Sequence, residues 1–241
     1  PARTRHHRRR ARTLSNRLVP RRCSHVLGRE PVKLYNWNVA PNPRRVRMFA
    51  HEKGIELDIV EVGEPGQPKL ANDYLDSNPH RIVPSLELAD GTVIGEVPVI
   101  CRYLEAIHPE PALFGRTPLE QAEIGMWERK CELEGMAPCA EILRNKVKAF
   151  DGRALPGYSI PIERIEALAD RGKLRLGVFY EKLDARLGAS EYIGGDAFSV
   201  ADITGFVTVE MATQGRNGIP EGCTNVARWH AAIAARESAN A

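Results

Sequence analysis

The amino-acid sequence predicts a small α/β domain followed by an all-α domain. Residues 32–108 alternate short strand patterns with helical periods, in the order β-α-β-α-β-β-α. The next stretch, "PEPALFGRTP" (109–118), holds three prolines and favours neither helix nor strand. From Leu119 onward helical periods dominate and strand patterns are few. We therefore expect two structural units joined by a proline-rich linker.

The first unit is expected to form a four-stranded mixed sheet with helices on its faces. Its "ADGT" turn separates two strand patterns and is a strong hairpin signal. In chain order the expected elements are a strand (32–37), a helix (42–55) that Gly54 ends, a strand (56–62), a short helix (67–78), a hairpin within 81–97 and a helix (98–108). This order is too compact for a doubly wound sheet and predicts a thioredoxin-like unit.

The second unit is expected to contain helices alone. Residues 119–150 predict one long helix or a pair interrupted near Pro138, and residues 162–188 predict another helix. The expected organisation is a tail (1–28), the α/β domain (29–107), the linker (108–118) and the helical domain (119–241).

A further helix is expected to begin at "FSVADIT" (198–204). Ser199 and Asp202 have the spacing of a capping box, with Asp in place of the usual Glu or Gln. Phe198 and Ile203 fall at the two hydrophobic-staple positions on either side.

Charge is unevenly distributed along the chain. Residues 1–28 hold nine arginines and no acidic residue, whereas the remainder carries 25 basic against 31 acidic residues, a formal charge of −6. Nucleic-acid binding is therefore not expected outside the tail. The tail is poor in apolar residues and is expected to be disordered. Three interpretations stay open: upstream sequence without function, a polyanion-binding arm, and an Arg-rich organelle transit peptide.

The cysteines and the hydropathy pattern limit the remaining classes. The five cysteines, at 23, 101, 131, 139 and 223, form no CxxC pair and no Cys/His cluster, which favours reduced thiols in the cytoplasm and no metal site. No apolar run reaches the length of a membrane span, and no apolar signal segment is expected at the N-terminus.

The stretch "RIVPSLELADGTVIGEV" (81–97) suggests a ligand site. Pro84 donates no ladder hydrogen bond, so if the Val83–Pro84 bond is cis, a ligand amide can pair with Val83 like an added strand; an ordinary trans proline at a strand edge is the alternative. Glu96 precedes a helix and can accept an ammonium group, while the amides of that helix start accept a carboxylate. Together they fit an α-amino acid head. Alternatively, Glu96 is only a solvated carboxylate.

These patterns resemble the soluble, bacterial-type glutathione S-transferase family from about Val32 to the C-terminus. The resemblance is carried by "NPHRIVPSLELADGTVIGE" with "ICRYLE" after it, and by "FSVADIT", which is similar to the family's N-capping motif. It implies a thioredoxin-like domain, a helical glutathione-transferase domain, glutathione as co-substrate and a homodimer.

The resemblance also implies how glutathione is held. The Val83 main chain would pair with the cysteinyl part beside a cis Pro84, and Glu96 would hold the γ-glutamyl ammonium. Val97 stands where the family usually has Ser or Thr, so only a backbone N–H remains for the γ-glutamyl carboxylate. Arg81 stands where a glycine is usual and is expected to reshape the turn before Val83.

The position that resembles the family's catalytic serine is Ala40, which has no hydroxyl. A hydrogen bond to the glutathione sulfur favours thiolate over thiol, so another donor is needed. Asn38 is the first candidate and Asn42 the second; both also suit purely structural roles, as turn former and helix N-cap. Ala40, Asn42 and Lys69 are expected to contact glutathione.

The electrophile would occupy an apolar pocket between the two domains, as in the family. Trp37, Met126, Trp127 and Cys131 are the expected lining residues. The spacing of 127 and 131 fits one helix face, which also fits a core or dimer-interface role.

The expected function is conjugation of glutathione thiolate to small apolar electrophiles. One alternative is a non-catalytic binding protein of this fold, which Ala40 and Val97 would permit. The other is a glutathione-dependent disulfide or peroxide reductase, which is disfavoured because the loop lacks a cysteine and Cys101 lies too far along the next helix.

Overall fold

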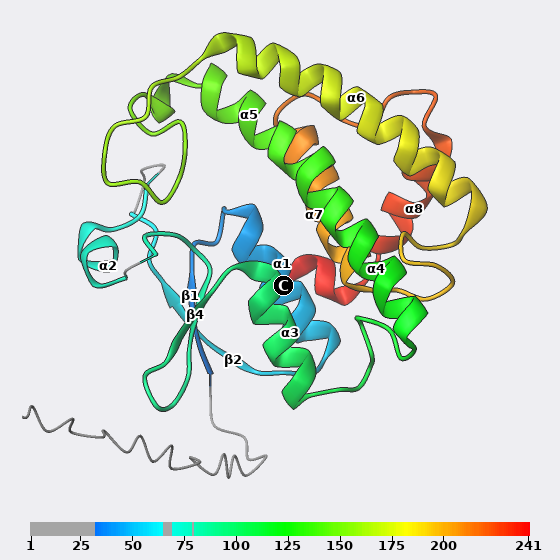
Figure 1. The fold of residues 1–241 in the computed structure, drawn as a ribbon, viewed down its shortest axis with the longest axis horizontal. Helices are drawn as coiled ribbons and strands as arrows, with labels where there is room; N and C mark the ends of the chain where they lie inside the picture. Colours follow the sequence, from blue (N-terminus) through cyan, green and yellow to red (C-terminus); the bar gives the residue numbers. More distant parts are fainter. Residues whose placement is uncertain (1–31, 65–68, 79) are drawn as a thin grey trace, which may run out of the picture.

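The computed structural model describes residues 32–64, 69–78 and 80–241 of the chain (Figure 1). Both expected units are present, a sheet with flanking helices followed by a bundle of helices. The Arg-rich tail (1–28) and Cys23 lie outside the described residues, and the three interpretations of the tail stay open.

The expected mixed sheet is confirmed, with the strand order β2-β1-β3-β4. Its strands are β1 (Val32–Asn36), β2 (Leu57–Glu61), β3 (Ser85–Glu87) and β4 (Val93–Gly95). Strand β2 runs parallel to β1, because a helical crossover joins them, whereas β3 is antiparallel to both β1 and β4. In the turn between β3 and β4, Gly91 has a φ of +82°, a conformation that glycine adopts without a steric cost.

Three helices accompany the sheet: α1 (Pro41–Glu52), α2 (Asn72–Ser77) and α3 (Val97–Ile107). Helices α1 and α3 lie between the sheet and the helical bundle, whereas α2 lies on the other side of the sheet (Figure 1). Helix α2 is shorter than predicted, because part of the segment before it pairs as extended backbone. Ala71 N–H donates to the Val62 carbonyl at 2.9 Å, and Glu64 N–H donates to the Lys69 carbonyl at 2.8 Å.

The core of the α/β unit lies where the sheet meets α1 and α3. The fully buried apolar side chains there include Leu34, Leu86, Phe49, Ile100 and Leu104. Burial of each contributes about 1.5–3 kcal/mol relative to an exposed position. This core holds the first turns of α1 and α3 in place, and these turns carry several of the expected site residues.

The helical unit contains one long interrupted helix and three further α-helices. Its elements are α4 (Pro118–Lys130), the π-helical segment η1 (Cys131–Met136), α5 (Ala137–Lys146), the 3₁₀ turn η2 (Lys148–Phe150), α6 (Glu166–Ala189), α7 (Val200–Gln214), α8 (Thr224–Ala234) and the 3₁₀ turn η3 (Glu237–Asn240). The predicted interruption near Pro138 is the π-helical segment. Pro138 has no N–H to donate to the preceding turn, which accounts for the irregularity there.

The predicted capping box at the start of α7 is confirmed. Ser199 donates to Asp202 Oδ2 from its N–H at 3.0 Å and from its hydroxyl at 2.9 Å. Asp202 Oδ1 accepts from Ile193 N–H at 2.8 Å and from Trp229 Nε1 at 2.9 Å. Burial raises the Asp202 pKa to about 6, and these four donors oppose the increase.

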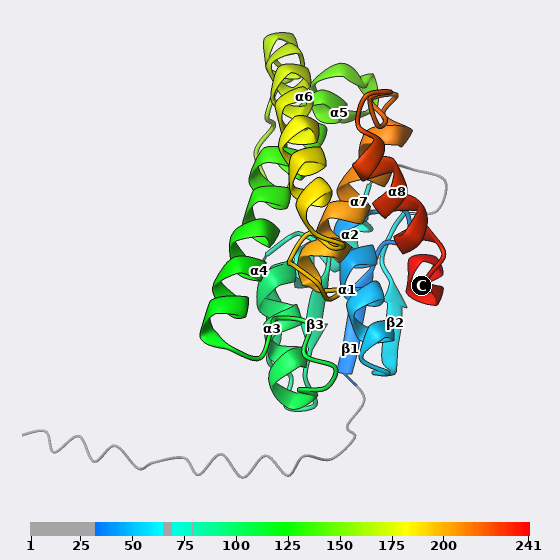
Figure 2. The same ribbon diagram turned by 90° about the vertical axis from the view of Figure 1, so that its right-hand side faces the viewer.

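The two units are joined by more than the linker. Helix α1 packs against α7 and η3, and Figure 2 shows the C-terminus beside α1. Arg236 Nε and Nη2 donate to the Glu52 carboxylate at 2.8 and 2.7 Å, and the Ser238 hydroxyl donates to the same carboxylate. Within the described part of the chain, no helix has the combination of length and apolarity that crossing a membrane requires.

Candidate functional site

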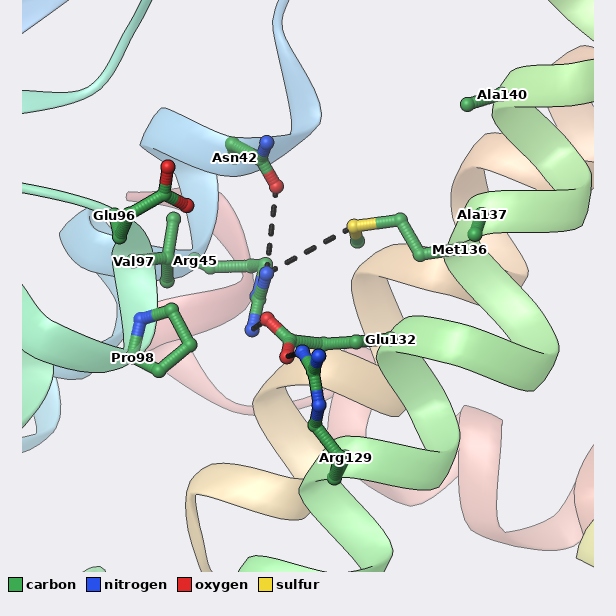
Figure 3. A pocket seen from close by; sticks show the side chains of 10 residues that line it. All are labelled: Asn42, Arg45, Glu96, Val97, Pro98, Arg129, Glu132, Met136, Ala137 and Ala140. Carbon is green, nitrogen blue, oxygen red and sulfur yellow. Dashed lines mark hydrogen bonds and ion pairs between the residues drawn. The ribbon is translucent and has the colours of Figure 1, made fainter. Parts of the chain in front are cut away.

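A cavity of about 230 Å³ opens between the two units, where the starts of α1 and α3 face η1 and α5 (Figure 3). The lining residues are Asn42 and Arg45 of α1, Glu96, Val97 and Pro98 around the start of α3, and Arg129, Glu132, Met136, Ala137 and Ala140 of the helical unit. Polar side chains therefore line both the α/β side and the helical side of the cavity, and only the part formed by α5 has small apolar side chains.

Arg45 is the buried hub of this cavity, with a side chain only 3% exposed. Its Nε and Nη2 donate to Thr204 Oγ1 at 3.2 and 2.9 Å, and Nη2 also donates to Glu132 Oε1 at 2.8 Å. Its Nη1 donates to Asn42 Oδ1 at 3.3 Å. A buried guanidinium requires such pairing, because desolvating an unpaired charge costs several kcal/mol.

Glu96 occupies the N-cap position of α3 in an unusual backbone conformation, with φ +63° and ψ 120°. A positive φ in a residue other than glycine costs about 1–3 kcal/mol and is found preferentially at functional sites. The residue is exposed, and its carboxylate forms no hydrogen bond or ion pair within the described part of the chain. Val97 follows with a buried side chain, so it can offer a ligand only its backbone.

Two carboxylates, Glu132 and Glu128, lie on the helical side of the cavity and differ in their pairing. Glu132 Oε2 accepts from Arg129 Nη1 at 2.9 Å, while its Oε1 accepts from Arg45. Behind this wall Glu128 is buried, and its Oε1 has no hydrogen-bond partner among the described residues. Burial raises the Glu128 pKa to about 7, and the Arg45 guanidinium, 3.8 Å from Oε1, opposes the increase.

Three of the expected glutathione contacts meet at this cavity: Asn42, Glu96 and Val97. The Val83–Pro84 bond is cis, as the resemblance implied. Neither the N–H nor the carbonyl of Val83 forms a hydrogen bond with another described residue, so both are available to a ligand.

In the turn before Val83, Arg81 adopts a left-handed backbone conformation. Arg81 has a φ of +52°, and its Nη1 donates to the Leu75 carbonyl at 2.9 Å. An arginine therefore occupies the left-handed backbone conformation that usually favours glycine.

The loop after β1 is held by hydrogen bonds to Glu61 of β2 and within the loop itself. Asn38 N–H lies 3.1 and 3.2 Å from the two Glu61 carboxylate oxygens, and Ala40 N–H donates to the Trp37 carbonyl at 2.9 Å. Asn38 is exposed and is not part of the cavity lining. The interpretation of Asn42 as the helix N-cap is wrong, because α1 begins at Pro41 and Ala40 is its N-cap.

None of the four residues expected to line the electrophile pocket lines this cavity. The Trp37 indole lies so close to Gly63 that a Cβ at Gly63 would be 2.1 Å from it. Met126 is half exposed on α4, and Trp127 packs between the Lys130 and Arg186 cations, each 5.6 Å from a ring centroid. Cys131 is fully buried, and burial raises its thiol pKa well above the ordinary value. The core interpretation of Cys131 fits the structure.

Lys69, which was expected to contact glutathione, lies in the loop before α2, apart from the cavity lining.

The sequence reasoning missed the helical side of the cavity. Met136 and Ala140 are four residues apart, and Arg129 and Glu132 are three apart, so each pair can share one helix face. This helical spacing beside the Pro138 interruption was the only sequence pattern that could have indicated the helical side of the cavity. It did not identify the inward face, because the π-helical segment rotates the faces of α4 and α5 relative to each other.

Comparisons with known proteins agree on one family. The family model described as glutathione S-transferase, N-terminal domain, matches residues 39–107, and the model described as glutathione S-transferase, C-terminal domain, matches residues 152–237. Glutathione S-transferase 2 of Saccharomyces cerevisiae is 32% identical to this chain, over 85% of this chain and 86% of the yeast protein.

Solved structures show the same similarity. A glutathione S-transferase of class Gtt2 from Vibrio parahaemolyticus is 34% identical, with a TM-score of 0.72 over 86% of this chain and 94% of that one. A glutathione S-transferase domain-containing protein from Marinobacter aquaeolei is 29% identical, with a TM-score of 0.76 over 86% of this chain and 98% of that one.

Proposed function

Because this chain belongs to the glutathione S-transferase family, we propose that it transfers the thiolate of glutathione to a small apolar electrophile in the cavity between its two domains. The observation that carries the proposal is the Glu96 carboxylate, which has no partner among the described residues and lies beside the N-terminus of α3 on the α/β side of that cavity. A ligand that spans both must carry a cation at one end and a group suited to amide donors at the other.

Glutathione meets this description. Its γ-glutamyl ammonium would pair with Glu96, and its γ-glutamyl carboxylate would take the Val97 N–H at the start of α3. The cysteinyl main chain would pair with the free N–H and carbonyl of Val83, with Ala40 and Lys69 as further contacts. The Val97 side chain supplies no hydroxyl to the carboxylate, which weakens binding by about 1.5–3 kcal/mol relative to a chain with Ser or Thr there.

The thiol would lie near the first turn of α1. Asn38, in the loop before α1, and Asn42, in its first turn, are the two candidate amide donors, and the helix start contributes a positive partial charge. Both effects favour the thiolate. The thiolate electron pair forms the S–C bond, and the electron pair displaced from the electrophile departs with the leaving group or takes a proton from water. Proximity and thiolate stabilisation supply the rate enhancement.

The electrophile would lie against Met136, Ala137 and Ala140. The two alanines leave room for a substrate, and Met136 is a flexible apolar side chain that adapts to different shapes. This wall replaces the aromatic lining that the sequence suggested, and it favours compact apolar substrates over extended ones.

The cellular setting is also part of the proposal. The four cysteines that the structure describes, at 101, 131, 139 and 223, are free and buried, which fits a reducing cytoplasm and a role in detoxifying electrophiles. We expect a two-fold homodimer, the commonest homo-oligomer. Exposed apolar side chains on α3, α4 and η1, namely Val99, Met126 and Leu133, are available to such an interface.

A non-catalytic binding protein is the second candidate, because Ala40 brings no hydroxyl to the thiol position. Titration of the thiol of bound glutathione at its ultraviolet thiolate band separates the two. For the enzyme, the thiol pKa falls by about one unit or more below that of free glutathione, each unit being 1.36 kcal/mol of stabilisation. Binding with an unchanged thiol pKa and no turnover of an activated aryl halide would indicate the non-catalytic protein. Failure to bind glutathione at all would reject both.

A further inference from the structure

We propose that Asn42 is the group that donates a hydrogen bond to the glutathione sulfur, and that Arg45 is a positioning residue that orients the Asn42 amide. This inference rests on the proposed function and deepens it. It replaces Asn38 as the first candidate, and it makes the helical domain part of the device that activates the thiol.

The orientation of the Asn42 amide follows from the chemistry of its partner. A guanidinium has donors and no acceptor, so the amide atom 3.3 Å from Arg45 Nη1 must be the oxygen Oδ1. The amide nitrogen Nδ2 must then point away from Arg45. Figure 3 shows this arrangement at the edge of the cavity. Within the described residues Nδ2 has no hydrogen-bond partner, so its two N–H groups are available to a ligand.

Arg45 is held too firmly for the amide to turn. Its side chain is 3% exposed, and its remaining nitrogens are occupied by the Thr204 hydroxyl and the Glu132 carboxylate. Thr204 belongs to α7 and is itself fully buried. The donor Asn42 and the positioning residue Arg45 therefore both belong to α1, whereas the groups that hold Arg45 in place come from the helical domain.

The charge on Arg45 is paired where it stands, chiefly with Glu132. Glu132 Oε1 lies 2.8 Å from Nη2, and Glu128 Oε1 lies 3.8 Å from the same nitrogen. We therefore assign to Arg45 the orientation of the amide, and to Asn42 the direct contact that favours the thiolate.

Asn38 is a matched comparison. It lies in the loop between β1 and α1, four residues before Asn42, but it is exposed, its backbone N–H is bound by Glu61, and it lies outside the cavity lining. Asn38 is therefore the competing candidate, and a raised thiol pKa in Asn38→Ala with none in Asn42→Ala would overturn the assignment of Asn42.

The test compares the full-length protein with Asn42→Ala, Asn42→Asp and Asn38→Ala. Asn42→Asp keeps an oxygen for Arg45 and the size of the side chain, so the fold is preserved while the N–H donors are lost. We expect Asn42→Ala to raise the thiol pKa of bound glutathione by about one unit, which lowers kcat/KM about tenfold at a pH below both values. Asn42→Asp should raise the thiol pKa further, because its carboxylate repels the thiolate.

Positioning by Arg45 is tested through its buried partner. Thr204→Val removes the hydroxyl that accepts from Nε and Nη2 of Arg45, whereas Thr204→Ser keeps it. We expect Thr204→Val to shift the pH profile of kcat/KM toward higher pH and Thr204→Ser to restore it. A purely structural role would lower the melting temperature of Thr204→Val without moving the pH profile, and that result would overturn the positioning role.

The outcomes separate this inference from the proposed function. If the unaltered protein binds glutathione with a lowered thiol pKa and Asn42→Ala keeps that pKa, the assignment of Asn42 is wrong while the transferase proposal stands. If the unaltered protein neither binds glutathione nor lowers the thiol pKa, the transferase proposal itself fails.

Discussion

At the scale of single residues, two strained positions frame the proposed glutathione site. Glu96 and Arg81 both have positive φ angles although neither is a glycine. Glu96 keeps a free carboxylate at the start of α3, whereas Arg81 uses its side chain to bind the end of α2. The first strain is thus associated with a ligand site, and the second is offset by a local hydrogen bond.

Loss of the Glu96 charge should weaken glutathione binding. Glu96→Gln replaces a charged acceptor of the ammonium by a neutral one, a loss of about 1.5–3 kcal/mol. Calorimetric titration should show a dissociation constant about 10- to 100-fold higher. Glu123→Gln is the control, because Glu123 is an exposed carboxylate of α4. Equal affinities in the two variants would show that Glu96 does not hold glutathione.

Glycine should be better tolerated than alanine at position 81. Both substitutions lose the hydrogen bond to the Leu75 carbonyl, but only glycine also relieves the left-handed conformation. Chemical denaturation should therefore show Arg81→Gly to be more stable than Arg81→Ala by about 1 kcal/mol. The opposite ranking would mean that the turn relaxes to a negative φ without the arginine.

At the scale of elements, the start of α7 depends on one buried carboxylate. Ser199→Ala removes the hydroxyl that donates to Asp202 Oδ2, and we expect it to lower the free energy of unfolding by about 1–2 kcal/mol. The bond is made to the ionised carboxylate, whose pKa is raised to about 6. The destabilisation should therefore be larger at pH 8 than at pH 5. Denaturant titrations at both values measure it, and a pH-independent loss would exclude the coupling to Asp202.

At the scale of the whole molecule, the domain interface contains a carboxylate that costs stability when ionised. Burial raises the Glu128 pKa to about 7, above the 4.5 of an unperturbed Glu, so its stabilising effect is complete below pH 4.5 and is lost as the pH rises through 7. This group alone should lower the free energy of unfolding by about 3 kcal/mol across that range.

Glu128→Gln should abolish this dependence. The Arg45 guanidinium keeps Glu132 as its partner at 2.8 Å, so the interface survives the substitution. We expect the variant to be more stable than the unaltered protein at pH 8, and to show a flatter stability profile between pH 5 and pH 8. If the two proteins lose stability in parallel as the pH rises, a different group is responsible.

Features that depend on neighbouring residues could be predicted from the amino-acid sequence. The "ADGT" hairpin, the end of α1 near Gly54 and the capping box of Ser199 and Asp202 all follow from turn and cap chemistry within a few positions. The order of these elements then predicted the mixed sheet and the helical domain.

The side chains that form the cavity could not be predicted in this way, because contacts between distant segments bring them together. Arg45 binds Thr204, which is 159 positions away along the chain, and no local sequence pattern predicts that contact. The orientation that Arg45 imposes on the Asn42 amide is equally invisible to a local pattern. Trp127 likewise does not line the cavity, and its ring contacts Arg186 from another helix. Periodicity identifies the apolar or polar face of a helix, but not the element that packs against that face. Long-range packing of the two domains sets that partner, because the burial of a side chain and the pairing of its charge both depend on the facing element.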